Sequence, residues 1–447
     1  MVSFYGVPAN YQRCCGVPIS KIGEAMRICV VSPQWPPVIT GGGGVAVYNL
    51  VRELSRGNEV TVYTFGVGTL PVEEFVRLGG VVRVVRVFTR DSPRIRTPFD
   101  GSKIEEISRL MEFAERASHI ISREGYDVVH LHGHFVVPSM ARRLRGFVSR
   151  IVVTFHALES VIEAEKGAFS SGKNVLRTII RLEREALECS DIVTVGSRAM
   201  ALKIAEIHGE EFIKKIHVVH NGVEDHFFSW ARREGVIRKL RQMYASGGPM
   251  IYNLNRIDPS KGIEYAIRAM PIVSNAVGRV SLVIAGKFEE RNKKYLEFLM
   301  AEKASVEDRS MASISILRNI DEETKIGLFD AADIFVMTSP TEPFGITILE
   351  SLARGTPVVV PDAEGPREIF GVEHVPSGGL RRIPAGIMVD FSKPQDRGRM
   401  LARGILEALR NIEDLRREAR KMREVVKKKY SWREIAKKYL SIYRAGV

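Results

Sequence analysis

Cysteine is rare in this sequence, which has 447 residues and only four cysteines. Cys14, Cys15, Cys29 and Cys189 show none of the spacings that gather cysteines around a metal ion. A chain of this length can be stabilised by a hydrophobic core and does not need disulfides. The scarcity argues against a disulfide scaffold and a cysteine-ligated metal centre, and it predicts free thiols in a cytoplasmic protein.

Long hydrophobic runs are also missing. No stretch approaches the roughly 20 apolar residues that cross a bilayer, and residues 1–25 lack the apolar core of a signal peptide. Met26 directly precedes the first strand-like run, so residues 1–25 are expected to be an N-terminal extension, either disordered or a misassigned start. The sequence therefore predicts a cytoplasmic protein, at most peripheral to the inner face of the membrane.

Positive charge is abundant and unevenly distributed. The net charge is +13, and residues 410–444 contain 13 Lys or Arg against 5 Asp or Glu. This basic segment is interpreted either as a surface for an anionic membrane or acidic substrate, or as a solvated helix face. Nucleic acid is not expected as a partner, because no aromatic-studded basic groove or known binding module is visible.

Short runs rich in Val and Ile alternate with longer helical patterns, as in parallel strands covered by helices on both faces. The expected strands are 28–32, 60–65, 81–87, 128–132, 151–155, 192–195, 216–219, 251–255, 280–285, 314–317, 334–337, 357–360 and 386–389. The expected helices are 44–55, 103–124, 138–147, 174–189, 197–208, 261–275, 290–305, 321–330, 345–354, 396–412 and 431–444. This pattern predicts an α/β protein with doubly wound parallel sheets.

The length exceeds the size at which one core stops growing, so two domains are expected. The two βα series place a first Rossmann-like domain at 26–240 and a second at 248–430, with a linker near 222–248. A last helical segment, 431–447, follows the second series.

Four consecutive glycines, Gly41 to Gly44, follow the first expected strand. They match part of a dinucleotide-binding fingerprint, but residues 33–40 separate them from the strand, where that fingerprint needs a tight turn. No acidic residue ends the next strand to hold a ribose. The glycines instead predict a flexible loop before a helix, where backbone N–H groups can approach a phosphate or a sugar closely.

The segment from Glu342 to Glu350 contains two carboxylates around an expected helix start at Gly345. Glu342 precedes the helix, and Glu350 lies roughly 7 to 8 Å along it at about 1.5 Å per residue. A helix N-terminus attracts anions, so this layout suits a phosphate with hydroxyl-rich groups on both sides, as in a nucleotide sugar. An ordinary helix start with one solvated Glu is the alternative.

Cationic and imidazole side chains follow other expected strands. Arg256 ends the first strand of the second series and Lys261 follows in the same loop, where the two could neutralise a diphosphate. His132 and His156 end neighbouring strands of the first series, and His134 follows closely. Solvated charges and buried structural histidines are the alternatives for these positions.

Together these motifs resemble one family. The glycine loop, Thr154-Phe155-His156-Ala157, Asn221-Gly222-Val223, Asn255 to Gly262, Glu342 to Glu350 and Gly365-Pro366-Arg367-Glu368 occur in that family's order. The chain resembles a retaining glycosyltransferase of family 4 over residues 26–445. The resemblance implies the GT-B architecture, with two Rossmann-like domains facing across a cleft and a C-terminal helix, 431–447, crossing back to the first domain.

The resemblance also implies roles for individual residues. Arg256 and Lys261 would hold the diphosphate, and Ile346 and Thr347 would donate N–H groups to it. Glu342, Phe344 and Gly345 would contact the transferred sugar, as would His156. The other implied donor contacts are Glu350 to the ribose, the backbone of Arg318 and Asn319 to the base, and Gly43 and Gly44 from the first domain.

The implied reaction is hexosyl transfer from a UDP-, GDP- or ADP-sugar to a sugar, polysaccharide or lipid-linked acceptor. No Asp-x-Asp motif for a metal ion is seen, so no metal or other cofactor is expected. Glu224 and the extra glycines of Gly41 to Gly44 depart from the usual family pattern, which leaves the acceptor open. Two alternatives remain: a GT-B-like phosphorylase or epimerase, and a non-catalytic, membrane-associated protein that binds nucleotide sugars.

Overall fold

The computed structural model describes residues 25–165, 171–229, 234–245 and 247–445. Its described residues divide into two compact units, one within residues 1–221 and 432–447 and the other within residues 222–431. The expected N-terminal extension lies outside the described residues, apart from Ala25.

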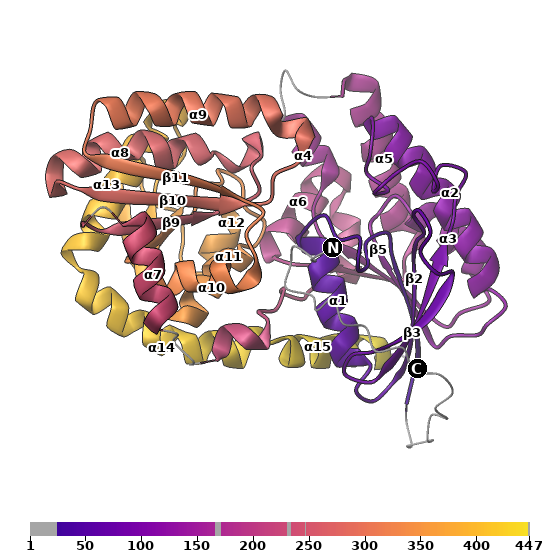
Figure 1. Cartoon of the computed structure of the whole chain (residues 1–447). Coiled ribbons are helices and arrows are strands. Elements are labelled where there is room, and N and C mark those ends of the chain that lie inside the picture. Colours follow the sequence, from indigo (N-terminus) through magenta and orange to yellow (C-terminus); the bar gives the residue numbers. More distant parts are fainter. Residues whose placement is uncertain (1–24, 166–170, 230–233, 246, 446–447) are drawn as a thin grey trace. The chain divides into compact units, whose positions relative to one another are not determined.

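The first unit is built on an eight-stranded sheet with the order β3-β4-β2-β1-β5-β6-β7-β8 (Figure 1). All neighbouring strands are parallel except β3, which is antiparallel to β4. The strands are β1 (Arg27–Ser32), β2 (Glu59–Phe65), β3 (Glu73–Arg77), β4 (Val81–Val87), β5 (Val128–His132), β6 (Ile151–Phe155), β7 (Ile192–Val195) and β8 (Ile216–Val218).

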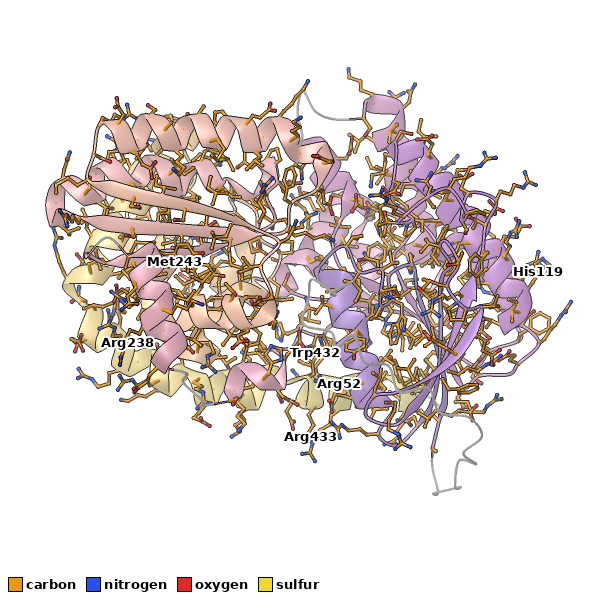
Figure 2. The ribbon with its side chains drawn as sticks, viewed as in Figure 1. Arg52, His119, Arg238, Met243, Trp432 and Arg433 are labelled. Atoms are coloured by element: carbon orange, nitrogen blue, oxygen red, sulfur yellow. The ribbon has the colours of Figure 1, made fainter. Side chains whose placement is uncertain are left out.

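Helices cover both faces of this sheet because alternate strand residues point to opposite sides. Cys29 and Val31 of β1 belong to a core with α2, α3 and α5, whereas Ile28 and Val30 belong to a core with α1 and α15. Trp432 begins α15 and is buried in this second core (Figure 2). The helices are α1 (Gly42–Leu54), α2 (Lys103–Ile121), α3 (Val137–Leu144), α4 (Glu159–Glu165), α5 (Lys173–Cys189), α6 (Arg198–His208) and α15 (Trp432–Arg444).

The second unit has a seven-stranded sheet with the order β11-β10-β9-β12-β13-β15-β14, in which only β14 is antiparallel to its neighbour. The strands are β9 (Met250–Leu254), β10 (Val280–Gly286), β11 (Ala312–Arg318), β12 (Ile334–Val336), β13 (Val358–Pro361), β14 (Leu380–Ile383) and β15 (Gly386–Val389). The helices are α7 (Glu234–Tyr244), α8 (Ile263–Val277), α9 (Lys293–Asp308), α10 (Glu322–Ala331), α11 (Ile346–Arg354), α12 (Glu364–Phe370), α13 (Arg397–Arg410) and α14 (Ile412–Tyr430).

Both sheets confirm the expected doubly wound α/β class, and every expected strand is present within two residues of its predicted ends. The chain order places β1 and β9 in the middle of their sheets, where the direction of winding reverses. The carboxyl ends of the central strands therefore lead into the loops that carry the candidate site residues.

The boundary expected between the domains is wrong. The sequence assigns residues up to 240 to the first domain and treats 222–248 as a linker. In the structure, residues from Gly222 onward belong to the second unit. Phe227 and Leu240 are buried in its core, and Arg241 of α7 donates to the carbonyl of Ala331 at 2.7 Å and pairs with Asp333 at 3.3 Å.

The basic segment 410–444 contains arginines that serve the fold. Arg423 is buried and donates to the carbonyl oxygens of Ala353 and Phe228, and Arg416 pairs with Asp333 at 2.5 Å. These arginines hold α14 against the rest of the second unit, so only the other basic residues of the segment are available to an anionic partner. In the described part of the chain, no helix has the length and apolar character needed to cross a membrane.

Candidate functional site

The loop between β12 and α11 carries Glu342 and ends at Gly345. Gly345 precedes α11 with a φ of 98°, in the left-handed region that favours glycine, and a Cβ there would lie 3.0 Å from Cδ1 of Ile348. The N–H of Gly365, at the start of α12, donates to the carbonyl of Glu342 at 2.9 Å. The loop is therefore held from both sides, and the predicted helix start at Gly345 is confirmed.

A second loop brings Lys261 to Glu342. Asp258 begins a short 3-10 helix (Pro259–Lys261) by accepting a hydrogen bond from the N–H of Ser260 at 3.0 Å. The hydroxyl of Thr338 donates to the carbonyl of Lys261 at 2.7 Å, and Lys261 Nζ lies 3.1 Å from Glu342 Oε2. The structure thus joins two residues that are 81 positions apart in the sequence.

Arg256 follows β9, the strand that pairs with β12. Buried Asn253 of β9 links the two strands near their carboxyl ends by donating to the carbonyl of Val336 in β12 at 2.8 Å. Arg256 is half-buried, and among the described residues it forms no ion pair or side-chain hydrogen bond. A cation without a partner, after a central strand, is available to an anionic ligand.

The segment after β11 forms a tight turn at Asn319. Asn319 has a φ of 54°, its N–H donates to the carbonyl of Gly286 at 2.9 Å, and its Oδ1 accepts from the N–H of Phe288 at 3.0 Å. The guanidinium of Arg318 lies 5.6 Å from the centre of the Phe288 ring. The carboxyl end of β11 is therefore rigidly tied to that of β10.

Glu350 is buried inside α11 and paired with a lysine that sequence reasoning missed. Its Oε1 lies 3.0 Å from Nζ of Lys325 on α10, which also lies 3.0 Å from Glu322. Within the described residues, Oε2 of Glu350 is buried without a hydrogen-bond partner. Lys325 follows Glu322 by three residues, the ordinary spacing of an ion pair on a helix surface, so the sequence carries no signal that singles it out.

Among the described residues, three carboxylates, those of Glu350, Glu322 and Glu224, lie around a single lysine, Lys325. Glu322 also pairs with His226 at 3.0 Å, and Glu224 adds a third carboxylate near Lys325. Burial raises the pKa of Glu350 to about 7, while the positive charge of Lys325 opposes this rise and that of Glu322 adds to it. Burial on its own would lower the pKa of Lys325, but the nearby carboxylates of Glu350, Glu322 and Glu224 raise it above its usual value, so Lys325 stays charged.

This pKa predicts a pH-dependent loss of stability. Folded Glu350 keeps its proton up to about pH 7, whereas the ordinary value is 4.5, so the folded state binds the extra proton between these limits. The stabilising contribution of Glu350 to the free energy of unfolding is fully present below its unfolded-state pKa of 4.5. This contribution is lost as the pH rises through its folded-state pKa of about 7. At about 1.4 kcal/mol per pKa unit, the loss is on the order of 3 kcal/mol.

The variant Glu350→Gln isolates this effect, because glutamine keeps the shape of a protonated carboxyl group. We expect its stability relative to wild type to increase from pH 5 to pH 8 in urea unfolding followed by circular dichroism. A constant difference between the two proteins across this range would contradict the assignment.

In the first unit, the glycines expected in a loop form the start of a helix. Gly42, Gly43 and Gly44 lie in the first turn of α1, which begins two residues earlier than expected. Oε1 of Gln34, another residue missed in the sequence, accepts from the N–H groups of Thr40 at 2.9 Å and Gly41 at 3.1 Å. A Cβ on Gly43 would lie 3.3 Å from Cδ2 of His156, so glycine allows the helix end to approach the imidazole.

The structure brings two of the candidate histidines together. Nδ1 of His132, at the end of β5, lies 3.0 Å from Nε2 of His156, which follows β6, and the two rings stack. His134 lies elsewhere, 3.8 Å from buried Glu183, which also contacts His208 at 3.2 Å. His132 and His156 thus form one pair, while His134 belongs to a separate polar cluster. Across the described ranges, no group of three or more His, Cys, Asp or Glu side chains is arranged to hold a metal ion.

Comparisons with known proteins agree with this geometry. Residues 40–227 match the model of Glycosyltransferase Family 4, and residues 238–429 match that of Glycosyl transferases group 1. An uncharacterized glycosyltransferase of Methanocaldococcus jannaschii is 29% identical, covering 94% of this chain and 99% of the relative.

Two solved structures share the fold over nearly their whole length. Sucrose-phosphate synthase from Thermosynechococcus elongatus has a TM-score of 0.74 at 21% identity, covering 94% of this chain and 98% of its own. HepE of Anabaena, solved in complex with UDP and glucose, has a TM-score of 0.68 at 17% identity. The match covers 94% of this chain and 100% of the HepE chain. The chain therefore belongs to the family 4 and group 1 glycosyltransferases with the GT-B fold, and it is an enzyme of that class.

Proposed function

We propose that this glycosyltransferase moves a hexosyl group from a nucleoside diphosphate sugar to a hydroxyl of an acceptor, with retention of the anomeric configuration. The observation that carries the proposal is the contact of Lys261 with Glu342 beside the N-terminus of α11. This contact places a cation, a carboxylate and a helix N-terminus together beside the carboxyl ends of the central strands. The cation and the helix N-terminus suit a pyrophosphate, and the carboxylate suits the hydroxyls of an attached sugar.

The residues divide between the parts of the donor. Arg256, Lys261 and the N–H groups of Ile346 and Thr347 bind the pyrophosphate. Glu350, whose Oε2 has no described partner, accepts hydrogen bonds from the ribose. The remaining assignments are Glu342, Phe344, Gly345, Gly43, Gly44 and His156 to the transferred sugar, and Arg318 and Asn319 to the base. The HepE complex with UDP and glucose supports a donor of this class.

The chemistry follows from where charge develops. As the glycosyl–phosphate bond breaks, positive charge builds on the sugar and negative charge builds on the departing diphosphate. Arg256 and Lys261 stabilise that negative charge more in the transition state than in the ground state. The leaving phosphate takes the proton of the acceptor hydroxyl, and that hydroxyl oxygen bonds to the same face of the sugar.

Glu342 also has a positioning role in this scheme. Its contact with Lys261 fixes Nζ before the donor arrives, so the cation does not have to reorient during the reaction. Because Arg256 and Lys261 supply the positive charge at the diphosphate, we expect the reaction to need no metal ion.

A donor screen tests the proposal. We expect one group among UDP-, GDP- and ADP-hexoses to raise the melting temperature of the protein and to bind in calorimetry, because a ligand of the folded state stabilises it. With the donor identified, turnover should persist in a chelator, and the product should keep the anomeric configuration of the donor. The proposal fails if no nucleotide sugar binds, if the chelator abolishes turnover, or if the configuration is inverted.

A further inference from the structure

The bond between His132 and His156 requires one ring to donate and the other to accept. Burial lowers the pKa of His156 to about 4 and holds the pKa of His132 well below its usual value, so both rings are neutral near pH 7. A neutral imidazole carries one N–H donor and one acceptor nitrogen. The direction of this single bond therefore fixes the tautomer of both rings.

The surroundings of His132 decide the direction. Its Nε2 is buried and has no partner among the described residues. If His156 donated to His132, His132 would carry its proton on Nε2. That Nε2–H would then be a buried donor without a partner. If His132 donates from Nδ1, its Nε2 carries only an unpaired lone pair. Folded proteins contain buried acceptors without a partner more often than buried N–H groups without a partner. His156 then accepts at Nε2 and carries its own proton on Nδ1.

The neighbouring His130 uses its ring nitrogens in hydrogen bonds to other residues, and its ring packs against that of His132. Nε2 of His130 lies 2.7 Å from the hydroxyl of Thr154, and Nδ1 of His130 lies 2.6 Å from the hydroxyl of Tyr443. Each ring nitrogen of His130 therefore has a hydroxyl partner that can donate or accept, whichever tautomer His130 adopts.

With both nitrogens used, His130 can only pack against the ring of His132, and the ring centres lie 4.0 Å apart. This packing limits rotation of the His132 ring. Every element of the set, including α15 through Tyr443, belongs to the first unit.

We propose that His132 is a positioning residue that holds His156 in the Nδ1–H form, so that His156 presents a hydrogen-bond donor to a hydroxyl oxygen of the transferred sugar. The identity of the ligand rests on the proposed function, whereas the tautomer does not. His156 then favours a sugar that carries an oxygen at the contacted position, because a deoxy analogue leaves the N–H unpaired.

Nuclear magnetic resonance of protein labelled with ¹⁵N in its histidine rings tests the tautomer directly, with the signals of His156 assigned by their loss in His156→Gln. In the wild-type protein we expect the proton of His156 on Nδ1. In His132→Asn the side-chain amide can replace the Nδ1 donor, so the tautomer should be kept. In His132→Leu the bond is lost, and a population with the proton on Nε2 should appear. His119→Asn, an exposed change on α2 (Figure 2), is the control and should alter nothing at His156.

Kinetics provide the second readout. His132→Leu should lower kcat/KM for the preferred donor roughly tenfold, the cost of about one hydrogen bond, and His132→Asn should restore most of it. A donor lacking the contacted hydroxyl should react equally with wild type and His132→Leu.

The inference is overturned if His156 of the wild-type protein carries its proton on Nε2, a measurement that needs no variant to fold. It is also overturned if His132→Leu folds and leaves the tautomer unchanged. Failure of the proposed function would show separately, as absence of nucleotide-sugar binding in a protein whose His156 tautomer is still as expected.

Discussion

Replacing Arg256 with methionine is expected to lower kcat/KM for the nucleotide-sugar donor by roughly 10²–10³-fold, the loss typical of one group that stabilises developing charge. Arg256 has no ion pair or side-chain hydrogen bond within the described residues, so the folded protein does not use its charge. The loss should therefore fall on catalysis, with little change in melting temperature. Steady-state kinetics and thermal unfolding on the same preparation measure both.

Arg238→Met provides the matched control. Arg238 is an exposed arginine on α7 of the same unit (Figure 2), and it makes no ion pair or side-chain hydrogen bond in the described part of the chain. This variant should keep full activity. If Arg256→Met kept the wild-type kcat/KM and donor affinity in calorimetry, the assignment of Arg256 to the pyrophosphate would be wrong.

Lys261→Met should behave differently from Arg256→Met. It removes the cation that we propose binds the pyrophosphate, and also the partner that lies 3.1 Å from Glu342. The sugar contact and the phosphate contact should both weaken, so the effects of changing Lys261 and Glu342 should not add. This contrast distinguishes a cation that acts alone from one that also orients a carboxylate.

The sequence predicts the fold well where hydrophobic patterns are strong. Central strands such as β1 and β10 are continuous Val- and Ile-rich runs because they are covered on both faces. The antiparallel strands β3 and β14 were missed because they lie at the edges of their sheets and are only partly buried. Helix α7 falls in the predicted linker because its apolar face is short, with Leu240 as its one buried residue among those described.

At the site, local signals were visible in the sequence and tertiary partners were not. Gly345 marks the start of α11 through local backbone chemistry, and Arg256 follows a recognisable strand. The bond of Lys325 to Glu350 and that of His132 to His156 each join residues on different elements, 25 and 24 positions apart. Neither pairing follows a sequence spacing rule. The packing of α10 against α11 brings Lys325 to Glu350, and the pairing of β5 with β6, whose neighbouring ends the sequence does predict, brings His132 to His156.

Replacing Lys325 with methionine should destabilise the second unit strongly. The lysine side chain is 16% exposed and pairs with Glu322 and Glu350, so its removal leaves buried Glu350 without its cation and Glu322 with only His226. Breaking a buried ion pair from one side costs about 3–5 kcal/mol, which lowers a melting temperature by on the order of 10 °C in a unit of this size. Calorimetric unfolding measures the loss.

The control is Lys303→Met. Lys303 pairs with Glu307 at 2.6 Å on α9 of the same unit, and both side chains are more exposed. Surface pairs of this kind contribute about 0–1 kcal/mol, so the melting temperature should change little. Equal effects of the two substitutions would show that Lys325 is no more important to the fold than a surface lysine.

The double variant Lys325→Met with Glu350→Gln separates the cost of the stranded charge from the loss of packing. Because glutamine carries no charge, the second substitution removes one of the carboxylates that Lys325 had balanced, and it should recover part of the lost stability. It should not recover donor binding, because a neutral amide oxygen accepts hydrogen bonds from the ribose more weakly than an ionised carboxylate does. Stability restored without binding would therefore show that α11 keeps a buried carboxylate for the ligand, with Lys325 as the cation that makes its burial tolerable.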